Sequence, residues 1–352
     1  MAQLKGTTDR ETALPALHAA MKRRLRRRIQ GAATMVVPAI PSLAEHYCDY
    51  MLEAFAFFGR PFAPADAEQL RELVRRVVDK AWEESPYARL HVEYHTEEAP
   101  EGGVSYDIKT VIQSVGEAYD TWIGSRPQPF FGAHANAKVM SLAHSLGIPE
   151  SVAVLDIGAG DGRNTLPLAQ AGFPTDSVEV SEGFAQLLRT KLLEAKLPGE
   201  VFQGDLLDSN LGLPIAHYKL VVLAGVLVAH VRGTHHLRAI LGVVSKVLRP
   251  GGEVLFSIFR TREGFEPDVL TRQLGEVFWT VMFTPAELSE AVEGLGLTLV
   301  DDVSYADYER EALPESWPPT DYFQAYVDGL DLFDLPAKRT PIDLRWLTYR
   351  KG

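Results

Sequence analysis

The chain has almost no cysteine, no long apolar run and no signal-peptide pattern at residues 1–6. Cys48 is the only cysteine among 352 residues, so no intramolecular disulfide can form, which suits a reducing cytoplasm. No run of 18 or more apolar residues occurs, so no membrane span is expected. Residues 1–6 lack the apolar core of a signal peptide. We therefore expect a cytoplasmic protein.

Basic charge is also scarce. The formal net charge is −12, and residues 263–343 hold 18 acidic but only 4 basic side chains. Because nucleic-acid binding depends mainly on basic groups that contact phosphates, neither DNA nor RNA is expected as a partner. The exception is the basic run at residues 22–28, which predicts an amphipathic helix with a solvated basic face. Docking onto an acidic partner, onto the chain's own acidic region or onto an anionic membrane surface remains an alternative.

What the chain does contain is a glycine-rich turn between a strand and a helix. Residues 152–157 form a short apolar run typical of a buried strand, and a helix is expected from Thr165. Between them stand Gly158, Gly160 and Gly162. Glycines allow a tight turn and close approach of a ligand, and the start of a helix presents N–H groups to it. The segment predicts a site for a nucleotide-like cofactor.

The spacing of these glycines narrows the choice of cofactor. A dinucleotide fingerprint needs a third glycine where Arg163 stands, so NAD is disfavoured. A phosphate-binding P-loop needs a lysine after the glycines, and none follows. A tight turn with a purely structural role remains the alternative.

Further elements follow in order. The second strand is predicted at residues 177–181 and carries Glu179, whose carboxylate can accept hydrogen bonds from both hydroxyls of a ribose. A helix is predicted over 182–194. The third strand, at 201–206, carries Asp205. The fourth and fifth strands are predicted at 218–224 and 247–257, the latter containing Pro250-Gly251-Gly252.

From Phe130 to Gly352 these motifs resemble the class I S-adenosylmethionine-dependent methyltransferase superfamily. Locally the chain is most similar to tellurite-resistance-type and thiopurine-type small-molecule methyltransferases, through residues 162–165 and 343–347. The resemblance implies an α/β fold with a Rossmann-like seven-stranded sheet and S-adenosyl-L-methionine as cofactor. It also implies that Asp205 binds the adenine amino group and that the Leu206 backbone binds the ring nitrogen. The residues expected to bind the cofactor are Asp156, Gly158, Ala159, Gly160, Gly162, Arg163, Asn164, Glu179, Val180, Asp205, Leu206 and Ala224.

Two regions are expected along the chain. Residues 1–126 are predicted to be mainly helical, with a possible hairpin near 89–110, and to form the acceptor pocket or a lid. Their helices are expected to begin at a capping box at Ser42 and at Asp66. Residues 127–352 are predicted to form the cofactor-binding core. The N-terminal helices are expected to pack over its cofactor face and help form the acceptor pocket, with Trp122, Phe130 and Phe131 near the wall of that pocket. The acidic, aromatic insertion at 304–339 is either a lid or a satellite hydrophobic cluster.

Methyl transfer from a sulfonium requires mainly alignment of the reactants and a dry site, and sometimes removal of a proton. His230 follows the fourth strand, where a histidine can act as a general base near neutral pH. The alternative is a hydrogen-bonded structural histidine. His134 is a weaker candidate base. No metal is expected, since His91 and His95 have only Glu93 between them and no further ligand nearby.

We therefore expect an enzyme that methylates a small-molecule acceptor on oxygen, nitrogen, sulfur or a chalcogen. One alternative is a catalytically silent regulatory module that binds S-adenosylmethionine, and another is a protein or peptide methyltransferase. The Asn/Asp-Pro-Pro-Tyr motif of amino-methylating enzymes is absent at residues 224–227, which disfavours nucleic-acid amines and glutamine amides as acceptors. The sequence predicts neither the acceptor nor an oligomeric state.

Overall fold

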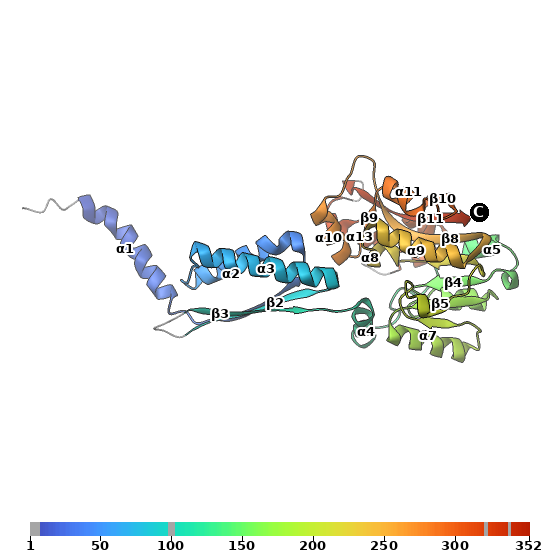
Figure 1. Ribbon diagram of the computed structural model, residues 1–352, viewed down its shortest axis with the longest axis horizontal. Helices are drawn as coiled ribbons and strands as arrows, with labels where there is room; N and C mark the ends of the chain where they lie inside the picture. The colour runs from blue at the N-terminus through green and yellow to red at the C-terminus, as the bar shows by residue number, and fades with distance from the viewer. Residues whose placement is uncertain (1–7, 98–102, 320–322, 337–338) are drawn as a thin grey trace, which may run out of the picture. The chain divides into compact units, whose positions relative to one another are not determined.

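The structure is a computed structural model that describes residues 8–97, 103–319, 323–336 and 339–352. The chain folds as two compact units, Met1–Gln113 and Ser114–Gly352 (Figure 1). The boundary falls earlier than the expected division after residue 126. As a result, helix α4 (Val115–Ser125) belongs to the C-terminal unit.

The N-terminal unit combines helices with a small sheet. Its elements are α1 (Thr8–Arg26), β1 (Ala32–Pro38), α2 (Ala44–Phe57), α3 (Pro64–Glu84), β2 (Arg89–Thr96) and β3 (Val104–Val111). The strands are antiparallel in the order β1-β2-β3. The predicted helices and the predicted hairpin are confirmed, although the tip of the hairpin, residues 98–102, lies outside the described residues. The sequence interpretation missed strand β1.

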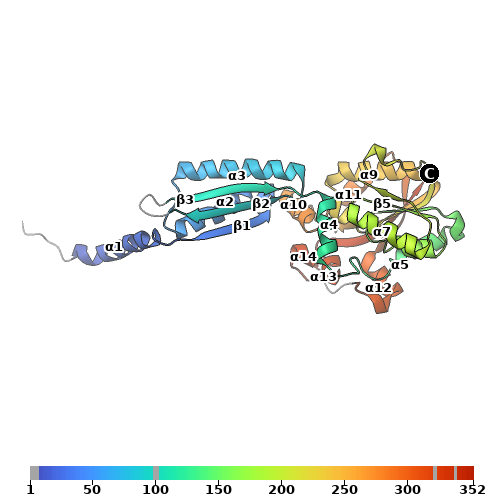
Figure 2. The same cartoon turned by 90° about the horizontal axis from the view of Figure 1, so that it is seen from below.

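Helices α2 and α3 cover one face of this sheet (Figures 1 and 2). Proline, and not a capping side chain, starts both segments. Pro41 opens a short 3₁₀ turn that leads into α2, and Pro64 occupies the first turn of α3. Proline is favourable there because its φ is preset and its missing N–H would have had no helical partner. The expected capping box at Ser42 and the cap at Asp66 are therefore wrong: the N-cap residues are Leu43 and Ala63, without side-chain cap bonds.

The predicted basic helix is confirmed as α1. Its apolar stripe is exposed, with Leu14 at 50 %, Leu17 at 56 %, Met21 at 60 % and Leu25 at 66 %. Arg27, the residue after the helix, is hydrogen-bonded to the rest of this unit: its Nε donates to the Gly59 carbonyl at 3.2 Å, and its carbonyl accepts from Arg60 Nη2 at 3.4 Å.

The C-terminal unit is built on a Rossmann-like sheet in the order β10-β11-β8-β7-β4-β5-β6, with the short strand β9 paired to β8. Strands β4 to β8 pair in parallel, whereas β11 is antiparallel to both of its neighbours. The predicted fold class is confirmed, with β9 as one strand more than expected. The strands are β4 (Val154–Ile157), β5 (Thr175–Glu179), β6 (Val201–Gln203), β7 (Tyr218–Leu223), β8 (Leu248–Thr261), β9 (Met282–Phe283), β10 (Leu297–Ser304) and β11 (Ile342–Lys351).

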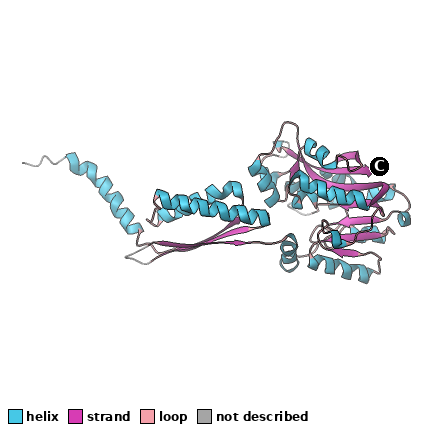
Figure 3. Cartoon of the chain, in the orientation of Figure 1, coloured by secondary structure: helices cyan, strands magenta, loops and turns pink. Residues whose placement is uncertain are grey.

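Helices cover both faces of this sheet (Figure 3). Alternate side chains of each central strand point to opposite faces of the sheet, so they pack into two separate hydrophobic cores. In β7, Val221 packs into the core under α9, whereas Val222 packs into the core under α5. The helices are α5 (Ala137–Ser145), α6 (Thr165–Gln170), α7 (Glu182–Ala195), α8 (Leu227–His230), α9 (Gly233–Val247), α10 (Val269–Val277), α11 (Pro285–Val292), α12 (Tyr305–Ala312), α13 (Phe323–Val327) and α14 (Leu330–Phe333).

The described part of the acidic, aromatic insertion packs against the sheet and shares a hydrophobic core with it, whereas residues 320–322 and 337–338 lie outside the described residues. Tyr305 stacks on the buried Trp346 of β11, with ring centroids 4.7 Å apart. The carboxylate of Glu309 accepts hydrogen bonds from the Ala137 and Lys138 N–H groups at 2.8 and 3.2 Å, so the insertion caps the start of α5. It also accepts from the Trp346 indole at 3.1 Å. The same segment contributes Pro319, Phe323 and Tyr326 to the wall of the cavity described next.

Candidate active site

A cavity of about 580 Å³ opens at the carboxyl ends of β4, β5 and β7, where open parallel sheets place their ligands. Every residue that the sequence assigned to the cofactor lines this cavity except Gly162. At Gly162, φ is +93° and an added Cβ would lie 2.6 Å from Leu188 Cδ1. This glycine therefore lets α6 and α7 pack closely, and its assignment as a cofactor-binding residue is not supported by its position.

The other two glycines of the turn face the cavity directly. An added Cβ would lie 2.3 Å from Val226 Cγ2 at Gly158 and 2.7 Å from Phe131 Cε2 at Gly160. Both residues also have positive φ, +69° and +56°, which side chains disfavour. The side chains of Val226 and Phe131 therefore pack directly against these two glycines at the wall of the cavity.

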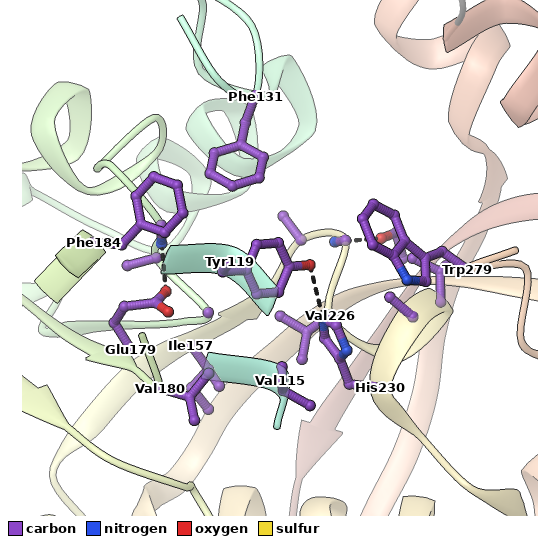
Figure 4. Close-up of a pocket in the computed structure, with 18 of the residues that line it drawn as sticks. Val115, Tyr119, Phe131, Ile157, Glu179, Val180, Phe184, Val226, His230 and Trp279 are labelled. Atoms are coloured by element: carbon purple, nitrogen blue, oxygen red, sulfur yellow. Dashed lines mark hydrogen bonds between the residues drawn. The ribbon is translucent and has the colours of Figure 1, made fainter. Parts of the chain in front are cut away.

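Glu179 ends strand β5 beside this turn (Figure 4). Its carboxylate is 5 % exposed and accepts hydrogen bonds from Gly160 N–H at 2.7 Å and Ser181 N–H at 2.9 Å. Burial raises the pKa of this carboxyl, and the backbone hydrogen bonds oppose that rise. Each oxygen keeps acceptor capacity for a further donor.

Asp156 and Asp205 differ in their position and in their hydrogen-bond partners. Asp156 is 2 % exposed, and its Oδ2 accepts from Thr165 Oγ1 at 2.7 Å, which holds the start of α6 against β4. Burial raises the pKa of Asp156 to about 6. Asp205 lies beyond β6, which ends at Gln203, and its Oδ1 accepts from Leu207 N–H at 2.9 Å. Asp205 is thus a loop residue at the edge of the cavity rather than the end of a strand.

Arg163 and Asn164 join the glycine turn to the insertion. Asn164 Oδ1 accepts from Asn136 N–H at 2.9 Å, and Asn136 Nδ2 donates to Tyr305 Oη at 2.7 Å. Arg163 lines this cavity and also a neighbouring one of about 280 Å³. His134, the weaker candidate base, is exposed and lines only the neighbouring cavity, so it is separated from His230.

His230 lies on the short helix α8, just after β7, and lines the main cavity. Burial, and to a smaller extent the nearby His236, lower the pKa of this imidazole to about 4. The ring is therefore neutral at neutral pH. Its Nε2 lies 2.8 Å from the Tyr119 hydroxyl, which donates to it when the ring proton is on Nδ1 (Figure 4).

Around His230 the cavity wall is aromatic. Phe130 and Phe131 line it as predicted, whereas the side chain of Trp122 lies outside the described residues. The sequence interpretation did not place Tyr119, Trp279 or the other rings here, because they come from segments that only the fold brings together. The rings it missed are Tyr119, Phe184, Phe278, Trp279, Tyr305, Phe323 and Tyr326.

Within the described ranges, no three His, Cys, Asp or Glu side chains gather to form a metal site. Over the same ranges, no helix combines the length and the apolar character needed to cross a bilayer.

Comparisons with known proteins agree with this arrangement. Residues 154–252, which carry the glycine turn, Glu179 and His230, match a family model described as a methyltransferase domain. The ubiquinone biosynthesis O-methyltransferase of Methylobacterium nodulans is 27 % identical over 162 residues, which cover 43 % of this chain and 62 % of that protein. The match thus spans less than two thirds of this relative.

Solved structures give similar folds. The geranyl diphosphate C-methyltransferase of Streptomyces coelicolor A3(2), in complex with Mg²⁺, geranyl diphosphate and S-adenosyl-L-homocysteine, is 15 % identical with a TM-score of 0.47, covering 61 % of this chain and 79 % of that one. The magnesium protoporphyrin IX methyltransferase of Synechocystis PCC 6803, with bound S-adenosylmethionine, is 15 % identical with a TM-score of 0.40, covering 62 % and 79 %. The likeness to tellurite-resistance-type and thiopurine-type enzymes stays a prediction.

Proposed function

We propose that this protein is an S-adenosylmethionine-dependent methyltransferase that acts on a hydroxyl group of a small molecule. One observation carries the proposal. A single cavity joins a glycine turn and a buried carboxylate, both inside the segment that matches a methyltransferase domain, to a neutral histidine that contacts a hydroxyl.

The residues present fit the cofactor. Gly158 and Gly160 line the cavity, so their backbone would lie beside the methionine part of the molecule. Glu179 would accept hydrogen bonds from the ribose hydroxyls, and Asp205 with the Leu206 backbone would hold the adenine ring. When bound, the cofactor supplies an activated methyl group on a positively charged sulfur. The aromatic rings around the cavity would exclude water and favour that charge.

His230 would accept the proton of the acceptor hydroxyl. Because its pKa is near 4, the imidazole is an available acceptor at any pH above about 5. We therefore do not expect the histidine titration near neutral pH that the sequence suggested. The pH dependence of the rate should instead follow the hydroxyl of the acceptor. Oxygen is proposed as the acceptor atom because the curated relative is an O-methyltransferase.

The test uses full-length protein. Calorimetry should show binding of S-adenosylhomocysteine and none of NAD, and a panel of phenols should give S-adenosylhomocysteine as product. His230→Ala should lower the rate roughly 100-fold with little change in S-adenosylhomocysteine affinity. His134→Ala, outside the main cavity, is the matched control and should leave both unchanged. Binding without turnover on any acceptor would favour a regulatory module, and normal turnover by a stable His230→Ala protein would refute the role of His230.

A further inference from the structure

Tyr119 of α4 fills the part of the cavity that lies between the Glu179 side and the His230 side (Figure 4). Its ring stacks against Trp279, with centroids 6.1 Å apart and planes at 29°. His230, Phe131 and Phe184 meet it edge-on, with centroids 5.4, 6.2 and 6.2 Å away. Stacked and edge-to-face contacts at these separations are the favourable arrangements for aromatic rings. The cavity therefore contains a slot that matches one six-membered aromatic ring.

The hydroxyl of this ring lies where an acceptor hydroxyl is needed. Tyr119 Oη is 2.8 Å from His230 Nε2, within the distance required for proton transfer to a base. A phenol held in this slot would have its flat ring fixed by Trp279 and its oxygen fixed by His230. Tyr119 is itself such a phenol, tethered to the protein.

Trp279 adds an independent observation. It follows the end of α10 with a φ of +58°, a position where glycine is the usual residue. A bulky side chain in this left-handed conformation is strained, and strain of this kind is concentrated at functional sites. The Trp279 carbonyl is held by the Tyr326 hydroxyl at 2.8 Å. A tryptophan kept here against its backbone preference indicates that the indole ring is needed as a wall of the slot.

Tyr119 belongs to helix α4, which packs beside α7. Among the described residues, α4 is joined to α7 through Asp120, whose Oδ1 accepts from the Gly183 N–H at 3.1 Å and from the Ser181 hydroxyl. Most of the other side chains of α4 are exposed or half-buried. A small displacement of this helix would therefore withdraw Tyr119 without disturbing the sheet.

We infer that the slot occupied by Tyr119 is the acceptor site, that the acceptor is a neutral monocyclic phenol, and that Tyr119 competes with it. The inference rests on the proposed methyl transfer. In that reaction the phenol oxygen forms a bond to the methyl carbon, the S–CH₃ bond breaks with its electron pair remaining on sulfur, and the phenolic proton passes to His230 Nε2. The products are the methyl ether and S-adenosylhomocysteine.

The decisive variant is Tyr119→Ala, which removes a side chain with the shape of 4-methylphenol. Calorimetry in the presence of S-adenosylhomocysteine should show that 4-methylphenol binds this variant at least tenfold more tightly than the wild type. The variant should prefer 4-methylphenol over toluene about 3- to 10-fold, because toluene leaves His230 Nε2 without a donor. Adding His230→Phe should abolish that preference. With S-adenosylmethionine, Tyr119→Ala should form 4-methylanisole faster than the wild type does.

Binding that equals the wild type, or binding without preference over toluene, would overturn the inference. So would tight binding without 4-methylanisole while the wild type methylates another acceptor. If the wild type binds S-adenosylhomocysteine but consumes no S-adenosylmethionine, the proposed function fails, and the binding comparison still decides the slot.

Tyr119→Phe keeps the ring and removes only the competing hydroxyl, so it covers the case in which the alanine variant does not fold. It should raise kcat/KM for a phenol about 2- to 10-fold. A fall in kcat/KM would show instead that Tyr119 positions His230. Tyr50→Ala, which removes a 55 % exposed tyrosine of the N-terminal unit, is the control and should change neither binding nor turnover.

Discussion

The carboxyl group of Asp156 should make the protein less stable at neutral pH than a neutral side chain would. It is 2 % exposed, and burial raises its pKa from 3.8 to about 6. A raised carboxyl pKa means that the folded state binds a proton more readily than the unfolded state does. The stabilisation that this proton provides is complete below pH 3.8 and is lost as the pH rises through 6.

The magnitude follows from the shift. Two pKa units correspond to about 3 kcal/mol between the charged and the neutral group, at 1.36 kcal/mol per unit. Asp156→Asn replaces the carboxylate by a neutral group of the same shape, and Thr165 Oγ1 can still donate to its oxygen. The added amide N–H₂ needs a partner, which offsets about 1 kcal/mol. We expect the variant to be more stable than the wild type by about 2 kcal/mol at pH 7.5, with the difference vanishing near pH 4.

Urea unfolding followed by tryptophan fluorescence at pH 7.5, 6, 5 and 4 measures this difference. The opposite titration of His230, whose lowered pKa reduces stability as the pH falls from 6.5 toward 4, affects both proteins equally and cancels. Asp307→Asn, at a side chain that is 75 % exposed, is the matched control and should show no such trend. A difference that is constant with pH, or a variant less stable at pH 7.5, would refute the reasoning.

Two further results are expected. Glu179→Ala should weaken S-adenosylhomocysteine binding in calorimetry by about 2–4 kcal/mol, because two ribose contacts would be lost. Asp205→Ala should weaken it by about 1–3 kcal/mol, because only one contact would be lost. A larger loss at Asp205 would contradict the assignment of Glu179 to the ribose. Glu309→Ala should lower the free energy of unfolding by about 3 kcal/mol, since it leaves two α5 N–H groups and the Trp346 indole without their acceptor. If calorimetry shows an unchanged melting temperature, water replaces the carboxylate as the acceptor.

The cofactor half of the site could be predicted from the sequence because its geometry is local. The turn from β4 to α6 needs glycines within a few residues of a buried strand, and the end of β5 places Glu179 beside it, with Gly160 and Glu179 only 19 positions apart. Periodicity likewise located strands β4 to β8 of the large sheet to within a few residues. Strand β1 was not predicted because its sequence shows little alternation of apolar and polar residues. Only a few of its side chains are half-buried, and the strand ends in Pro38.

The acceptor half could not be predicted in the same way. Tyr119 and His230 are 111 residues apart, and only the folding of the chain brings them within hydrogen-bond distance. The same holds for Glu309, which caps α5 from 172 residues away. No spacing rule connects such positions.

The sequence by itself determined where strands β4 to β8 lie along the chain, the glycine turn and the carboxylate at the end of β5, because each depends on neighbours along the chain. The tertiary structure decided what those elements enclose. It placed Trp279 against Tyr119, covered Gly160 with Phe131 and buried His230 until its pKa fell to about 4. Burial and ring packing depend on which distant segments meet in space, and that is settled only when the chain has folded.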